Sequence, residues 1–298
     1  MDFKGLLQVF GRPWLIEESQ AAYWANIAQQ ILVSRTMDAI PGMDPRTRSG
    51  HAQAYAGLAY RDIFRVNANA EMDPNGQVQV IRLSGPLMEE DYCGAPGMNT
   101  MQQAIRAANA DASIESIVLL NDSPGGTVAG THNLAREVKR SKKPVVSFIN
   151  KMMCSADYWI GSSASEIIAD DENGGYNSLI GSIGTKCTIM DQSARMESQG
   201  IKIRHVYADK SSRKGKYMDD ILSGDDTRLK AELNQINEFF LSAVQENRAG
   251  KLRLDRENVL EGEVYNVKDA IRFGLVDKMG SFDYAVKRSL QMAKTIRA

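Results

Sequence analysis

The sequence predicts an α/β protein with a mainly parallel sheet covered by helices. From about residue 76, short β-type runs alternate with segments of helical periodicity, which is the pattern of βαβ units. The run 114–120 is strongly apolar, as expected of a strand buried on both faces. No repeat, linker or low-complexity tract divides residues 76–298, so we assign them to one domain.

The elements of this domain follow from hydrophobic periodicity and turn residues. Strands are expected at 78–83, 114–120, 144–149, 166–169 and 202–207. Helices are expected at 100–110, 128–140, 154–163, 193–199, 226–249 and 282–296, with a short unit at 263–280 before the last helix. The 226–249 pattern is the longest, with apolar residues every three or four positions.

Residues 1–75 are assigned to a separate, helical N-terminal extension. The segment 17–35 carries apolar residues at mixed three- and four-residue spacing, with Trp24 as a large anchor. The extension could pack on the body or serve as an arm that becomes ordered on assembly, and the sequence leaves both possibilities open.

Composition and charge exclude several classes of protein. The 298 residues include 43% hydrophobic side chains, as in ordinary globular proteins. With 36 basic and 37 acidic residues the net charge is −1, whereas a protein that coats nucleic acid needs a basic excess. No apolar run is long enough for an integral membrane segment, and the first residues do not have the pattern of a secretory signal. A cytoplasmic protein is therefore expected.

The cysteines indicate neither a disulfide framework nor a zinc site. Cys93, Cys154 and Cys187 are too few for the first and wrongly spaced for the second. We expect reduced and mostly buried thiols. No metal and no cofactor are predicted.

Two segments could carry chemistry at the end of a strand. In the turn 121–127, Gly125 and Gly126 could present backbone N–H groups to an oxyanion, although Pro-Gly-Gly is also ordinary turn chemistry. Ser155 follows a strand and opens an apolar helix, so its hydroxyl could be a helix cap or a nucleophile beside the Ala156 amide.

A third candidate is the basic loop 210–216, Lys-Ser-Ser-Arg-Lys-Gly-Lys, which could equally be a solvated charge run. The three histidines are scattered and have no evident serine or aspartate partners. If the protein is a serine enzyme, its base is therefore expected to be lysine, the known substitute for histidine in Ser-Lys enzymes.

Taken in order, these segments resemble the S49 peptidases, the signal peptide peptidase A-like serine proteases, whose phage branch includes capsid-maturation proteases similar to protein C. The matching motifs lie at 80–87, 123–126, 143–146, 153–160, 181–184 and 270–277. The resemblance covers about residues 76–285. It implies a crotonase/ClpP-like fold of stacked ββα units and an active homo-oligomer, located in the bacterial cytoplasm or, if phage-encoded, in the host cytoplasm or prohead.

The resemblance also implies roles for individual residues. Ser155 aligns with the nucleophile and the turn 123–126 with the oxyanion loop, with Gly125, Gly126 and Ala156 as candidate donors. The base should come from the 210–216 loop, but when the chain is aligned to the family's spacing without gaps, a serine falls at the position of the base. A small insertion selects Lys214, which we favour, an equal deletion selects Lys210, and Lys216 is third.

The function expected from the resemblance is a serine endopeptidase with a Ser-Lys dyad, acting on protein or peptide substrates in capsid or scaffold maturation or in signal-peptide degradation. One alternative is a catalytically inactive assembly protein of the same fold. Another is a crotonase-type acyl-CoA enzyme, although the sequence shows no signature of the acidic catalytic residue and adenine-binding loop usual in that class.

Overall fold

The computed structural model describes residues 14–16, 62–92, 95–171, 178–189, 191, 193–201, 204 and 206–297. The helix expected at 17–35 and Cys93 lie outside the described residues. Of the other two cysteines, Cys154 is buried as expected, whereas Cys187 is exposed.

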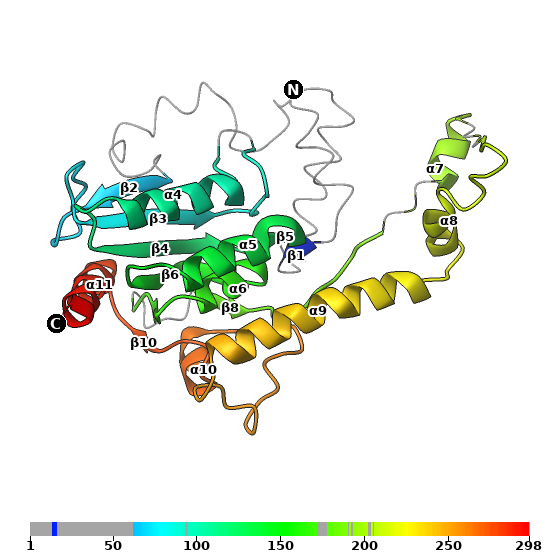
Figure 1. Ribbon diagram of the computed structural model, residues 1–298. Helices are drawn as coiled ribbons and strands as arrows, with labels where there is room; N and C mark the ends of the chain where they lie inside the picture. The colour runs from blue at the N-terminus through cyan, green and yellow to red at the C-terminus, as the bar shows by residue number, and fades with distance from the viewer. Residues whose placement is uncertain are drawn as a thin grey trace.

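An eight-stranded, mainly parallel sheet forms the centre of the molecule (Figure 1). The order along its main path is β10-β7-β6-β4-β3-β2, with β8 and β9 attached beyond β6. Only β2 and β9 pair antiparallel to their neighbours. The strands are β2 (Ile63–Val66), β3 (Val78–Ser84), β4 (Ser116–Ser123), β6 (Val145–Cys154), β7 (Glu166–Ala169), β8 (Leu179–Gly181), β9 (Val264–Tyr265) and β10 (Lys278–Met279). The predicted fold class is confirmed.

Helices cover both faces of this sheet, which explains why its central strands are apolar throughout. On β4, Ile117 and Leu119 join the core under α4 (Met98–Ala110), α5 (Val128–Lys139) and α6 (Ala156–Ser162). Val118 points to the opposite core, under α11 (Phe282–Arg297), because successive strand residues face opposite sides. Burying each such side chain contributes about 1.5–3 kcal/mol.

A long helix, α9 (Thr227–Asn247), carries the elements before it away from the sheet (Figure 1). Near its C-terminal end Phe240 is buried and stacks on Trp159 of α6, with ring centroids 4.9 Å apart. At its other end lie α7 (Ser193–Ser198) and α8 (Lys216–Leu222). We call residues 193–226 the lysine arm.

Most predicted helices agree with the observed ones, but the sequence-based assignment is wrong in two places. Residues 204, 206 and 207 are not in the strand expected at 202–207, and the other residues of that segment are outside the described part. Among the described residues no strand pairs with this segment, and an unpaired strand is not stable in water.

The second error concerns the N-terminal extension, where β1 (Trp14–Ile16) and β2 are strands in a segment expected to be helical. In β2, residues alternate between half-buried and buried, and the strand completes the edge of the sheet beside β3. The division of the chain at residue 75 stays a prediction. Within the described residues, no helix is long and apolar enough to cross a membrane.

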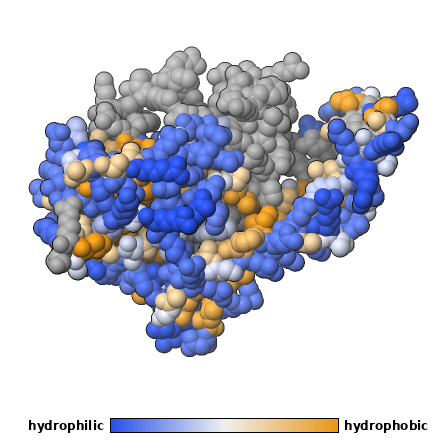
Figure 2. Space-filling view, viewed as in Figure 1, coloured by the Kyte–Doolittle hydropathy of each residue, from blue (hydrophilic) through white to orange (hydrophobic). Residues whose placement is uncertain are grey.

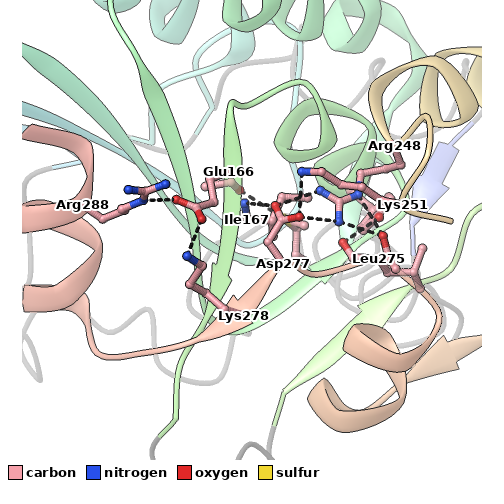
Figure 3. Close-up of polar contacts among 12 residues, drawn as sticks. Glu166, Ile167, Arg248, Lys251, Leu275, Asp277, Lys278 and Arg288 are labelled. Atoms are coloured by element: carbon pink, nitrogen blue, oxygen red, sulfur yellow. Dashed lines mark hydrogen bonds and ion pairs between the residues drawn. The ribbon is translucent and has the colours of Figure 1, made fainter. Parts of the chain in front are cut away.

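A buried ion pair fixes the C-terminal segment, including α10 (Val267–Arg272), to the sheet (Figure 3). Arg248 is only 1% exposed and donates two hydrogen bonds of 3.0 Å to the two carboxylate oxygens of Asp277. The same carboxylate accepts the N–H of Ile167 on β7. Nearby, the Tyr158 hydroxyl donates to Leu275 O, which anchors α6 to this segment.

We expect Asp277→Ala to lower the free energy of unfolding by about 3–5 kcal/mol, because it leaves the buried Arg248 charge without its carboxylate partner. Although burial raises it, the hydrogen bonds and charge of Arg248 hold the pKa of Asp277 below its ordinary value. This stabilisation is therefore present above about pH 4 and is lost as the pH falls through the lower folded pKa. Urea titration would measure the loss of unfolding free energy.

Asp283→Ala is the control, since it removes an exposed ion pair with Lys287 and should cost about 0.5 kcal/mol. Equal losses of unfolding free energy in the two variants would contradict the prediction.

Candidate active site

Three parallel strands of the sheet end together beside Ser155. Ser123 at the end of β4 pairs with Met153, and Cys154 at the end of β6 pairs with Gly181 of β8. The carboxyl ends of parallel strands are the usual place for a ligand site in α/β proteins. The segments selected from the sequence, 123–126, 153–160 and 181–184, therefore meet at one edge of the sheet.

Ser155 forms a strained turn between β6 and α6. It is buried and has φ 54° and ψ −119°, a left-handed conformation that costs a non-glycine residue about 1–3 kcal/mol. Its N–H donates to Gly181 O at 2.8 Å, and its C=O accepts the N–H of Trp159. The hydroxyl makes no capping hydrogen bond to α6, so the interpretation of Ser155 as a helix cap is not supported.

The glycine-rich turn continues as β5 (Gly125–Thr127), which packs against α6. Leu87 N–H donates to Gly125 O, and Thr127 N–H donates to Leu87 O. No described peptide bond is cis, and in a trans peptide C=O and N–H point in opposite directions. The N–H and C=O of Gly126 therefore both point away from Leu87.

This geometry separates the candidate oxyanion donors. Gly125 N–H donates to Ser123 Oγ, and Ser155 N–H is bound to Gly181. Gly126 has its N–H on the face turned away from Leu87, and Ala156 begins α6. A Cβ on Gly126 would lie 1.9 Å from Leu87 O, so only glycine fits there. Of the two glycines, Gly126 therefore remains the candidate donor, because its N–H is not bound to Ser123 or to Leu87.

The lysines of the 210–216 loop are not near Ser155 within one chain. Figure 1 shows α8, which begins at Lys216, at the far end of α9 from α6. Lys210, Lys214 and Lys216 are all exposed. The Lys216 ammonium bonds to Asp220 at 2.6 Å, and this hydrogen bond and charge raise the pKa of Lys216, opposite to the change that a general base requires.

Asp157, to which the sequence analysis gave no role, lies fully buried in the first turn of α6. Neither of its carboxylate oxygens has a hydrogen-bond partner. Burial, and then the charge of Asp122, raise the pKa of Asp157 well above its ordinary value. A charged residue type inside an otherwise apolar helix was the signal that could have drawn attention to it.

We expect Asp157→Asn to flatten the pH dependence of stability. Between the ordinary pKa of aspartate, about 3.9, and the raised folded pKa, the folded protein holds a proton that the unfolded chain releases. Stability should therefore fall by up to about 1.4 kcal/mol per pH unit as the pH rises through this window. Urea titrations at several pH values would measure the slope, and equal slopes in the two proteins would contradict the assignment.

The fold and the strained serine define an α/β protein with a candidate nucleophile at the carboxyl edge of its sheet. A sequence profile described as peptidase family S49 matches residues 137–296, more than half of the chain. The chain belongs to peptidase family S49. Its mainly parallel, helix-covered sheet agrees with the α/β class predicted from the sequence.

Several curated relatives carry protease names. A putative protease of Methanocaldococcus jannaschii is 29% identical over 61% of this chain and 58% of its own length. Capsid assembly protease C of Escherichia phage lambda is 28% identical over 91% of this chain and 61% of its own. Protease 4 of Salmonella typhi is 28% identical over 80% and 38%. The chain thus spans less than two thirds of each of these relatives.

Among solved structures, an enoyl-CoA isomerase of M. smegmatis is similar at 14% identity, with a TM-score of 0.42 over 74% of this chain and 81% of its own.

Proposed function

We propose that the chain is a serine endopeptidase that cleaves peptide bonds in protein or peptide substrates, with Ser155 as nucleophile and a lysine as base. The observation that carries the proposal is the strained Ser155, whose hydroxyl is not used to cap α6 and which lies beside a glycine turn. Strained serines at a strand-to-helix turn are typical of nucleophiles. Membership of family S49 supports the same reaction class.

In the proposed reaction, Ser155 Oγ attacks the substrate carbonyl carbon and its proton passes to the neutral lysine amine. The carbonyl oxygen becomes an oxyanion that accepts the Gly126 N–H, with Ala156 N–H as the second donor; each donor is worth about 3 kcal/mol. The lysine ammonium then protonates the leaving amine. Water, deprotonated by the same lysine, then attacks the acyl-serine carbonyl carbon; the bond to Ser155 Oγ breaks, and the lysine ammonium returns its proton to Ser155 Oγ.

We assign the base to Lys214, or to Lys210, on the lysine arm of a neighbouring copy. Within one chain the arm lies at the far end of α9 from α6, the helix that Ser155 precedes (Figure 1). The arm also carries five of the large exposed apolar side chains of the described residues, and Figure 2 shows apolar residues at the tip of the arm. They are Ile201, Val206, Tyr207, Met218 and Leu222. Such side chains favour contact with another copy.

Similarity to capsid assembly protease C over 91% of this chain favours capsid or scaffold protein as substrate, with signal-peptide degradation as the other role. The alternative, an inactive assembly protein, draws on the separation of the lysines from Ser155 in one chain. Incubating the purified protein with an unstructured protein such as β-casein tests the proposal. Peptide products that appear in step with protein concentration support an endopeptidase, and an intact substrate at every pH favours the assembly role.

A further inference from the structure

The chain's own N-terminal residues lie along the candidate active site. β1 pairs antiparallel with β5, with Trp14 opposite Thr127, Leu15 opposite Gly126 and Ile16 opposite Gly125. The two strands form a sheet of their own, separate from the eight-stranded sheet. Figure 1 shows β1 beside β5, next to α5 and α6.

The pairing uses the backbone of Gly126. Since Leu87 bonds to the backbone on either side of Gly126, the Gly126 N–H and C=O face the other edge of β5, where β1 lies. Leu15 is the residue opposite. The N–H proposed as the oxyanion donor thus faces the β1 backbone, and a substrate carbonyl and β1 cannot both occupy this position.

We propose that the outer edge of β5 binds an extended peptide backbone as an added antiparallel strand, and that residues 14–16 occupy this site as an intramolecular competitor that must leave before substrate binds. The inference rests on the proposed function and adds to it the substrate's conformation and a means of regulation. Strand addition takes its affinity from main-chain hydrogen bonds. The ligand class is therefore an extended peptide with a free N–H at the residue opposite Gly126.

With such a competitor, the apparent affinity for added peptide equals the intrinsic affinity multiplied by the fraction of chains in which the outer edge of β5 is open. Replacing Leu15 with proline removes the N–H opposite Gly126 and should expose the edge. Because β1 is outside the main sheet, the variant should keep its fold, which thermal unfolding would check.

The test is carried out on full-length Ser155→Ala protein, in which binding is measured without cleavage. The probe is a fluorescein-labelled peptide with the sequence of residues 11–18, followed by fluorescence anisotropy. Adding Leu15→Pro should tighten its binding by about fivefold or more. Leu15→Gly, a milder change that keeps the N–H, should give an intermediate gain. Leu15→Ala, which keeps the strand backbone, should change little.

A second probe, the same peptide with an N-methylated leucine at the position of Leu15, should bind none of these proteins measurably. Equal affinity of the probe for the parent and the Leu15→Pro protein would overturn the proposal that residues 14–16 compete with added peptide. Equal binding of the methylated and unmethylated peptides would overturn strand addition. Because the readout is binding, a protein that proves inactive as a peptidase can still pass or fail this test.

Discussion

Ser155→Ala should lower peptide-bond cleavage by at least about a thousandfold while leaving the protein folded. The substitution removes the oxygen that attacks the substrate carbonyl in the proposed mechanism. The loss of stability should be within about 1 kcal/mol, because the hydroxyl makes no capping hydrogen bond to α6. Initial rates on β-casein and thermal unfolding measure the two effects.

Ser163→Ala is the matched control, since this serine lies just beyond the other end of α6 and its hydroxyl bonds to Trp159 O. It should keep nearly full activity. A Ser155→Ala protein that cleaves at the native rate would remove Ser155 from the mechanism. If both variants lose the same amount of cleavage activity, the loss comes from disturbance of α6 and not from removal of the Ser155 hydroxyl.

Lys214→Ala should also reduce cleavage by orders of magnitude, and mixing should reveal where the base comes from. Ser155→Ala and Lys214→Ala chains are each expected to be inactive. When they are unfolded, combined in equal amounts and refolded together, about a quarter of the sites in a random homo-oligomer should join an intact Ser155 to an intact Lys214 of another copy. The mixture should then recover up to about a quarter of native activity.

Lys230→Ala, which removes an exposed α9 lysine paired with Asp226, controls for general changes in charge and should keep activity. If Lys210→Ala is inactive and Lys214→Ala is active, the base moves to Lys210. A mixture that stays inactive, although each variant assembles normally, would contradict delivery of the lysine by a neighbouring copy.

The sequence was sufficient to predict the sheet and the position of Ser155, because both depend on local patterns. The apolar run in β4 and the β6-to-α6 junction are buried on both sides, so hydrophobic periodicity marks them directly. In contrast, β1 is three residues long and pairs with a strand more than a hundred residues later. No local pattern specifies such a pairing.

The lysine arm shows a second limit of sequence reasoning. The apolar spacing in 226–249 predicts α9 correctly, yet only Phe240 and Val244 are buried. Periodicity identifies an apolar face without saying whether its own chain covers it. The same limit applies to Asp157, since its burial depends on how α6 packs against the rest of the molecule.

The most direct test of the serine mechanism is to trap the acyl-enzyme. The protein is mixed with an activated peptide ester, quenched rapidly in acid, digested, and analysed by tandem mass spectrometry. We expect the acyl group on Ser155 of the native protein and no acyl adduct in Ser155→Ala. Acylation of another residue, or efficient cleavage by a protein that never carries an acyl group on Ser155, would contradict the mechanism.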